Sequence, residues 1–344
     1  MRPPRFWYAA PDRPGPVPHL LAPLASLYGA ATARRVARRA VGGYRAAVPV
    51  ICVGNLDVGG TGKTPAVMAL TGMLAGRYGE VHVVTRGYRG RMRGPVRVDP
   101  RRHGAADVGD EPLLLAAFAP TWVARDRAAG VRAAEAAGAG VIVLDDGFQN
   151  PAIRPDFALV VVDAARGFGN RRVIPAGPLR EPVAAGLSRA DMILSIGEPR
   201  AQADFAARWG PEIAERTHLR GVLEPLATGM SWKGLRVLAF AGIGHPEKFF
   251  ATLRALGADL RRAEALADHQ PLTVRLMTRL TLEAKALGAQ LVTTEKDAVR
   301  LPASYRPKVL TLPVRLTLEE PEALEAALDR VVGPRADSTE SKNP

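Results

Sequence analysis

The stretch from Pro49 to Pro65, PVICVGNLDVGGTGKTP, most constrains the fold, because an apolar run leads directly into a glycine-rich turn that ends in Lys-Thr. Val50 to Val53 is short and mostly β-branched, which is typical of a buried strand. The turn that follows contains three glycines, Gly59, Gly60 and Gly62. Glycines let the backbone fold back so that its N–H groups point inward, and a helix is expected to begin near Thr64. The stretch therefore predicts a strand, an anion-binding loop and a helix.

Such a loop is expected to hold the triphosphate of a nucleotide. Lys63 would reach the outer phosphates, and the Thr64 hydroxyl would ligate Mg²⁺. The full phosphate-loop pattern places Gly where this chain has Asp57, and the loop of partitioning ATPases places a second Lys where it has Val58. The residues predicted to contact the nucleotide are Asp57, Val58, Gly59, Gly60, Thr61, Gly62, Lys63 and Thr64.

Strand-like and helix-like segments alternate along the chain, which predicts an α/β fold with parallel strands and crossover helices. Strands are expected at 50–53, 81–85, 121–124, 141–144, 157–162, 192–196, 235–241, 291–294 and 309–312. Helices are expected at 111–118, 127–137, 246–256, 272–287 and 321–332. The segment 167–182 is rich in Gly, Pro and charge, which predicts a long loop over the strand ends.

The 344 residues, 47% of them apolar, are enough for two domains. A pattern of the same kind restarts after Gly229, so a boundary is expected near residue 228. We predict an N-terminal helical segment at 1–45, a P-loop kinase-like domain at 46–228, a smaller α/β domain at 229–334, and a disordered tail at 335–344.

The formal net charge of +13 favours anionic partners such as nucleotides, phosphorylated substrates or an acidic bilayer face. Nucleic acid is not expected as a partner, because no basic block interleaved with aromatic residues and no reader motif occurs. Cys52 is the only cysteine, so no disulfide can form within the chain and a reducing cytoplasm is expected.

The first fifty residues contain apolar side chains at helical spacing, without a run long enough to span a bilayer. Phe6 and Trp7 precede a leucine stripe that ends before an arginine cluster. The stripe consists of Leu20, Leu21, Leu24 and Leu27. One interpretation is a helix that lies in a membrane interface, and the other is an ordinary packed helix. The sequence leaves both open.

Acidic pairs follow the predicted elements at two places. Asp145 and Asp146 end the apolar run GVIVL, where an acid beside a phosphate loop would hold the metal, although Asp-Asp-Gly is also a common turn. Asp110 and Glu111 begin a predicted helix, where helix capping alone could explain them. His269 lies between two predicted helices, and its imidazole facing a carboxylate would suit removal of a proton from a hydroxyl.

Taken together, the motifs resemble those of the tetraacyldisaccharide 4'-kinases, the lipid A 4'-kinases of Gram-negative bacteria. The resemblance runs from about Phe6 to Val332. It is carried by GNLDVGGTGKTP, RGY at 86–88, GDEP at 109–112, DDGFQ at 145–149, GN and PAGPLREP within 169–182, ADH at 267–269, and TTEKDAVRL at 293–301.

The resemblance implies transfer of the ATP γ-phosphoryl group to the 4'-hydroxyl of a tetraacyldisaccharide 1-phosphate at the cytoplasmic face of the inner membrane, with Mg²⁺. It implies catalytic roles for Lys63 and for a base dyad of Asp110 and His269. It also implies metal-supporting roles for Thr64, Glu111, Asp145 and Asp146. Residues that would hold the lipid substrate are Arg86, Gln149, Asn170 and Arg180. Where the family commonly has histidines, this chain has Asn150 and Gln270.

The principal alternative is a nucleotide-switch ATPase or GTPase of the partitioning or metallochaperone type, in which hydrolysis drives assembly. Val58 argues against the partitioning type, and Lys296 directly beside Asp297 does not match the guanine-recognition pattern Asn-Lys-x-Asp.

Overall fold

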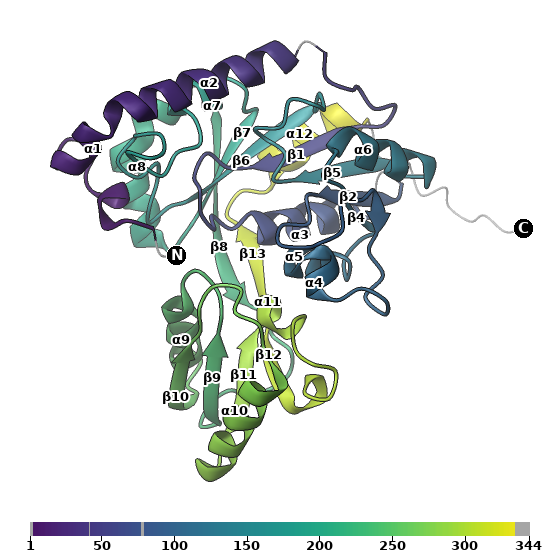
Figure 1. Ribbon diagram of the computed structural model, residues 1–344, viewed down its shortest axis with the longest axis vertical. Coiled ribbons are helices and arrows are strands. Elements are labelled where there is room, and N and C mark those ends of the chain that lie inside the picture. Colours follow the sequence, from purple (N-terminus) through teal and green to yellow (C-terminus); the bar gives the residue numbers. More distant parts are fainter. Residues whose placement is uncertain (1–2, 41, 77–78, 334–344) are drawn as a thin grey trace, which may run out of the picture.

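The computed structural model describes residues 3–40, 42–76 and 79–333. The chain forms a large upper lobe and a smaller lower lobe, which are joined by the long strands β8 and β13 (Figure 1). The tail at 335–344, predicted to be disordered, lies outside the described residues.

The larger lobe is built on a nine-stranded sheet with the order β13-β8-β7-β6-β1-β5-β2-β4-β3. β1 runs parallel to both of its neighbours, β5 and β6, as the alternating pattern predicted. Only the two edge pairs, β3 with β4 and β8 with β13, are antiparallel. The strands are β1 (Val50–Gly54), β2 (Val81–Thr85), β3 (Val96–Arg97), β4 (Thr121–Val123), β5 (Val141–Asp145), β6 (Phe157–Asp163), β7 (Met192–Ile196), β8 (Thr217–Pro225) and β13 (Val314–Leu318).

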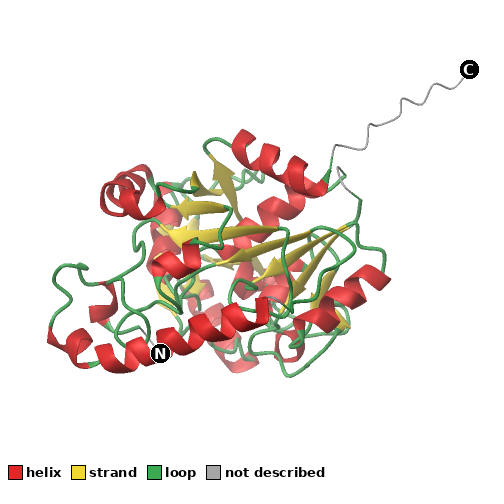
Figure 2. Cartoon of the chain, turned by 90° about the horizontal axis from the view of Figure 1, so that it is seen from above, coloured by secondary structure: helices red, strands yellow, loops and turns green. Residues whose placement is uncertain are grey.

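Helices cover both faces of this sheet, as the view from above shows (Figure 2). Alternate residues of β1 point to opposite faces, with Ile51 and Val53 in one core and Val50 and Cys52 in the other. The first core contains side chains of α3 (Lys63–Leu74), α5 (Asp110–Leu115) and α12 (Glu322–Val332), and the second contains side chains of α6 (Arg127–Ala136), α7 (Val183–Leu187) and α8 (Pro199–Ile213). The short helix α4 (Ala105–Val108) precedes α5. Because β1 lies at the centre, the loop that follows it is held on a rigid base.

The smaller lobe is a four-stranded parallel sheet with a helix on each face. Its order is β10-β9-β11-β12. Phe250 of α9 packs in the core on one face, and Met277 of α10 packs in the core on the other. The elements are β9 (Arg236–Ala241), α9 (Pro246–Ala255), β10 (Asp259–Ala265), α10 (Val274–Ala286), β11 (Gln290–Thr294), α11 (Glu295–Ala298), η2 (Arg306–Lys308) and β12 (Val309–Leu312).

The predicted unit at 229–334 needs a correction at its C-terminal end. β13 pairs with β8 in the larger sheet, and Leu324, Ala327 and Leu328 of α12 pack into the larger lobe. The chain therefore crosses between the lobes twice, through the antiparallel strands β8 and β13. The smaller sheet ends at Leu312. The sequence pattern predicted the helix at 321–332, now α12, but did not indicate which of the two sheets this helix covers.

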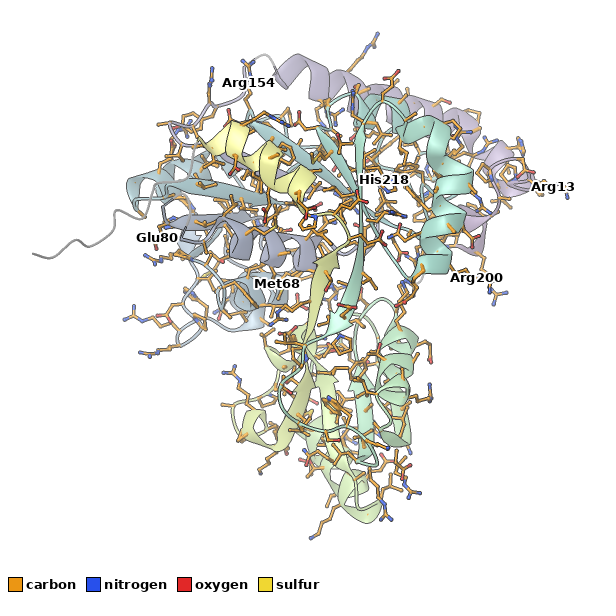
Figure 3. All side chains as sticks on the ribbon, turned by 180° about the vertical axis from the view of Figure 1, so that it is seen from behind. Arg13, Met68, Glu80, Arg154, Arg200 and His218 are labelled. Atoms are coloured by element: carbon orange, nitrogen blue, oxygen red, sulfur yellow. The ribbon has the colours of Figure 1, made fainter. Side chains whose placement is uncertain are left out.

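Several elements were not predicted from the sequence. α8 is an Ala- and Arg-rich helix whose buried side chains Phe205, Trp209 and Ile213 recur every four residues, a spacing that could have revealed it. His218 marks β8 beside it in Figure 3. β10 was missed because most of its side chains are polar and it lies at a sheet edge. α8 therefore carries a local signal that was overlooked, whereas β10 depends on its pairing with β9.

The N-terminal segment comprises η1 (Arg5–Tyr8), α1 (Pro16–Leu20) and α2 (Ala22–Ala40), which lies along the outside of the larger lobe (Figure 1). α2 rests on its small residues, with Ala25, Gly29, Thr32 and Val36 buried. No helix among the described residues is both long enough and apolar enough to cross a bilayer.

Candidate active site

The phosphate loop lies between β1 and α3, as the sequence predicted. Gly62 precedes the helix with φ 96°, and a Cβ added there would lie 2.6 Å from Ile196 Cδ1. Only glycine fits both the positive φ and the close approach. Lys63 and Thr64 therefore begin α3, where free backbone N–H groups and the positive end of the helix favour an anion.

The long loop at 164–182 packs against the phosphate loop. Val58 N donates to Pro178 O at 2.9 Å, and Arg180 N donates to Leu56 O at 2.7 Å. Within the loop, Asn55 Nδ2 donates to Asp57 O at 2.8 Å. The predicted location of this segment at the strand ends is therefore confirmed, and it holds the first half of the phosphate loop in place.

Asp57 replaces the usual glycine and is buried. Tyr8 donates to its Oδ2 at 3.4 Å, and Arg166 lies over the Tyr8 ring with its Cζ 4.6 Å from the ring centroid. Burial raises the pKa of Asp57 to about 6, although Arg166 opposes the shift. The N-terminal segment thus contacts the loop through Tyr8.

Asp146 lies between two cations at the end of β5. Lys63 Nζ lies 3.5 Å from Asp146 Oδ1, and Arg180 Nη1 donates to the same oxygen at 2.9 Å. Burial pushes the pKa of Asp146 upward, but Lys63 and Arg180 outweigh it and the pKa falls below its usual value. Asp146 is therefore ionised next to the phosphate loop. Arg180 also donates to Gln149 Oε1 at 3.2 Å, so four of the predicted residues, Lys63 included, meet here.

Asp145 points to a different side of the strand end. Its Oδ2 accepts from Thr85 Oγ1 at 2.8 Å. Asp146 has φ 53°, a left-handed turn that separates the two neighbouring carboxylates. Burial, followed by the charges of Glu111 and Asp146, raises the pKa of Asp145 to about 6.

Three carboxylates of the predicted metal set therefore lie close enough to repel one another. That mutual repulsion is what a divalent cation would relieve, and Mg²⁺ usually takes one or two carboxylates plus phosphate oxygens and water. The described residues contain no cluster of three or more His, Cys, Asp or Glu in ligand geometry. The donor set fits a cation that binds together with the triphosphate.

The two residues of the predicted base dyad meet across the two lobes. His269 Nδ1 lies 2.7 Å from Asp110 Oδ2, and both side chains are nearly buried, with 10% and 5% exposed. Burial raises the pKa of Asp110, but the hydrogen bond from His269 and the charge of Lys296 outweigh it, so the pKa lies below its usual value. Capping alone does not explain Asp110, since its carboxylate contacts the other lobe. Glu111 also bridges the lobes, because its Oε1 accepts from Lys296 Nζ at 2.8 Å.

The other two predicted substrate residues differ in their surroundings. Asn170 is buried, and its amide nitrogen donates to Phe6 O and Ala176 O at 3.0 and 2.9 Å. Its oxygen accepts from Arg172 N at 3.1 Å. Asn170 therefore braces a loop, and its geometry does not support contact with substrate. Arg86 is exposed and directly follows Thr85, the residue that donates to Asp145, so its role stays a prediction.

Sequence reasoning missed residues that support the site. Glu181 is fully buried, accepts from both Gln149 and Arg189, and so fixes the Gln149 amide. Lys296 and Arg300 reach Glu111 and Asp110 from the smaller lobe. The motif TTEKDAVRL contained the signal for both, but nothing in the pattern showed which acids they would face.

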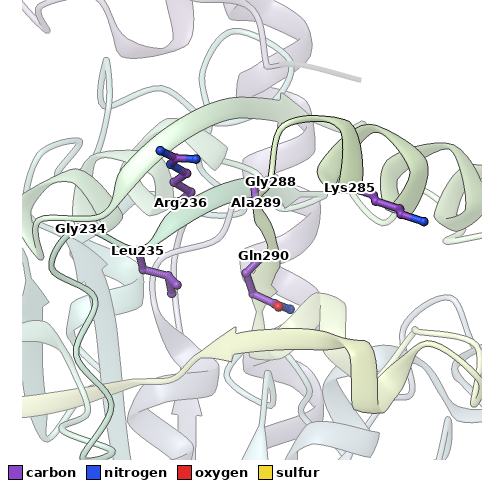
Figure 4. Close-up of a pocket in the computed structure, with 7 residues that line it drawn as sticks. All are labelled: Gly234, Leu235, Arg236, Lys285, Gly288, Ala289 and Gln290. Carbon is purple, nitrogen blue, oxygen red and sulfur yellow. The ribbon is translucent and has the colours of Figure 1, made fainter.

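Two hollows of the structure share no residue with this constellation. One, of about 560 Å³, lies in the smaller lobe and is lined by Gly234, Leu235, Arg236, Lys285, Gly288, Ala289 and Gln290 (Figure 4). The other, of about 350 Å³, lies between α2 and the segment 171–183. The candidate site contains the polar contacts that join the two lobes, His269 with Asp110 and Lys296 with Glu111.

Comparison with known proteins gives one consistent match. Residues 17–333 match the profile of the family described as Tetraacyldisaccharide-1-P 4'-kinase. The chain is 67% identical to the tetraacyldisaccharide 4'-kinase of Dinoroseobacter shibae over 96% of this chain and 97% of the relative. It is 58% identical to that of Jannaschia sp., over 97% and 100%. A crystal structure of LpxK from Aquifex aeolicus in complex with ATP matches with a TM-score of 0.74 and 26% identity, covering 92% of this chain and 100% of that one.

Proposed function

The chain belongs to the tetraacyldisaccharide 4'-kinase family and is an ATP-dependent lipid A 4'-kinase, and from that premise we propose which of its residues perform each part of the transfer. The alternative of a nucleotide switch is not favoured by these comparisons. One observation carries the assignment of roles: His269 contacts Asp110 between the lobes, and the neighbouring Glu111 lies near enough to Asp145, at the end of β5, to raise the pKa of that carboxyl.

The triphosphate would bind at the start of α3. The loop amides and Lys63 would neutralise charge on the transferred phosphoryl group, because phosphoryl transfer depends mainly on alignment and charge stabilisation. Lys63 now faces Asp146 at 3.5 Å, so it lies within reach of an anion at the loop. Asp145, Asp146, Glu111 and Thr64 would hold Mg²⁺, which would supply positive charge to offset that of the triphosphate.

The dyad would take the proton of the attacking hydroxyl. The 4'-oxygen forms a bond to the γ-phosphorus, the bond from that phosphorus to the bridging oxygen of ADP breaks, and the hydroxyl proton passes to Asp110, with His269 orienting the carboxylate. Proton acceptance of this kind contributes about 10²- to 10⁴-fold to the rate. Gln149 and Arg180 would contact the disaccharide, since both line the loop beside Asp146.

We also propose that the leucine stripe docks the protein on the cytoplasmic face of the inner membrane. Leu20, Leu24 and Leu27 are exposed on α1 and α2, opposite to the small residues that pack on the lobe. Exposed Arg34 and Arg35 follow on α2, where anionic headgroups would attract them. Phe6 and Trp7, which precede the stripe, are half-buried, and Trp7 Nε1 donates to Pro175 O at 3.0 Å.

The catalytic assignment is tested by replacing Lys63, Asp110 or His269 with alanine and following ATP-dependent phosphorylation of purified disaccharide 1-phosphate by mass spectrometry. We expect His269→Ala to lower kcat by about 10²-fold or more and to change KM little, because the dyad acts in the transition state. His103→Ala is the control, since His103 only accepts from the backbone of its own turn. Undiminished turnover in Lys63→Ala or Asp110→Ala, or an effect of His269→Ala on KM alone, would contradict the roles.

A further inference from the structure

One segment of the smaller lobe reaches both acids of the GDEP motif. Lys296 Nζ donates to Glu111 Oε1 at 2.8 Å, and Arg300 Nε lies 3.7 Å from Asp110 Oδ2. Lys296 lies in α11, which directly follows β11, and Arg300 follows α11, so both cations come from one short stretch of chain. The role of Arg300 in this arrangement goes beyond an ordinary surface ion pair, because its side chain is only 7% exposed.

The guanidinium of Arg300 is held in one orientation by groups on several sides. Nη1 donates to Gln270 O at 2.8 Å, and Nη2 donates to Gly242 O at 3.1 Å and also contacts the carboxylate of Asp297. Asp297 is fully buried and accepts from Gly242 N at 3.1 Å and from Thr294 Oγ1 at 2.7 Å. Asp297 therefore anchors Arg300, because any movement of the guanidinium away from it would leave a buried carboxylate without an opposite charge.

The two carbonyl groups that accept hydrogen bonds from Arg300 also fix the position of the His269 backbone. Gln270 is the next residue, and Gly242 O also accepts from His269 N at 3.0 Å. His269 itself has φ 59°, a left-handed conformation that a non-glycine residue keeps only when its surroundings enforce it. A Cβ at Gly242 would lie 3.1 Å from both Arg300 Nη2 and Ala267 O, so the packing around this turn is tight.

We propose that Arg300, anchored by Asp297, is the positioning residue that holds the His269 imidazole against Asp110. This inference rests on the proposed roles of Asp110 and His269. Arg300 acts through the backbone on both sides of His269, and it touches neither reactant. Its planar fork can serve Gln270 O, Gly242 O and Asp297 together, whereas a lysine ammonium is a compact charge on a flexible stem that lacks the fixed geometry.

A purely structural role would look different from a positioning role. If Arg300 only stabilised the smaller lobe, its replacement would lower the amount of folded enzyme and act equally whatever residue stood at 269. If it positions His269, its effect must depend on that imidazole. Residues that act as a unit show non-additive losses, and a double-mutant cycle measures this dependence.

The experiment compares Arg300→Lys in the full-length enzyme and in the His269→Ala background, with kcat measured at saturating ATP and disaccharide 1-phosphate. Asp297→Asn is the second variant, since it loosens the anchor while Arg300 stays. Arg306→Lys is the matched control, because Arg306 Nε donates to Leu301 O at 3.3 Å in the same region but contacts nothing around His269. Urea unfolding of each variant corrects for loss of folded protein.

We expect Arg300→Lys to lower kcat about 10- to 100-fold with KM for both substrates nearly unchanged, because small misplacements of a catalytic group are costly. In the His269→Ala background the same change should lower kcat less than about 3-fold, since the group it positions is gone. Asp297→Asn should follow the same pattern, and Arg306→Lys should leave kcat unchanged. Equal losses in both backgrounds, or a change in KM alone, would overturn the inference. An unchanged kcat in His269→Ala alone would instead refute the proposed dyad.

Discussion

Removing the exposed leucines of the N-terminal helices should detach the protein from membranes without harming its chemistry. The perturbation is the triple change Leu20→Gln, Leu24→Gln and Leu27→Gln. These side chains are 81, 58 and 70% exposed, so none of them contributes much to the core. The fold and the active site should therefore survive, while the apolar surface offered to a bilayer is lost.

The expected magnitude follows from the exposed fractions. Together they amount to about two complete leucine side chains, and burying each is worth about 2 kcal/mol. The lost binding free energy is then about 4 kcal/mol, or about 10²- to 10³-fold in the partition coefficient. Attraction of Arg34 and Arg35 to anionic headgroups should remain, so weak binding that disappears at high salt is expected to persist.

The assay is co-sedimentation with vesicles of phosphatidylethanolamine and phosphatidylglycerol, paired with kcat on detergent-dispersed disaccharide. The matched control is Val274→Gln with Leu282→Gln on α10, two side chains that are 59 and 65% exposed on the smaller lobe. The control should bind vesicles like the parent. Parental binding by the triple variant, or equal loss in the control, would refute the claim that this stripe is the docking surface.

Two further predictions concern the phosphate loop. Gly62→Ala should destabilise the protein by about 1–2 kcal/mol or more in urea unfolding and raise KM for ATP, because a left-handed alanine is strained and its Cβ meets Ile196. The control is Gly72→Ala on the same helix, where an added Cβ meets open space, and it should neither lower the stability nor raise KM. Asp57→Asn should stabilise the protein by about 2–3 kcal/mol above pH 7, and this gain should vanish toward pH 4. Burial raises the pKa of Asp57 to about 6, so the folded protein binds more protons at this carboxyl than the unfolded chain does. The free-energy cost of ionising the buried carboxyl therefore appears as the pH rises through that range. A gain in stability that is the same at both pH values would contradict the second prediction.

Much of the larger lobe could be predicted from the sequence because its signals are local. The β-branched run before the glycines, the glycines themselves and the Lys-Thr that follows specify strand, loop and helix within a few residues. The same holds for Asp145 and Asp146, since an apolar run that ends in acids places them at a strand end. Local patterning also found α12 and the strands of the smaller sheet except β10.

The assignment of elements to lobes could not be obtained in this way. β13 and α12 return to the larger sheet through pairing with β8, and such pairing depends on chain paths that are distant in sequence. Asn170 was misjudged for the same reason. Its residue type suits contact with a substrate, but the loop at 164–182 folds onto η1 and the Asn170 amide donates to Phe6 O.

The sequence by itself determined the chemistry that is available here: a phosphate loop, acids after strands, one histidine in a turn, and a family resemblance that the comparisons confirm. Only the tertiary structure decided which groups meet, bringing His269 to Asp110 and Lys296 to Glu111 across more than 150 residues of chain. The physical reason is that residue type and local pattern fix backbone conformation over a few residues. Contacts between lobes depend on the packing of two separate sheets with their helices and on the pair of strands that joins them.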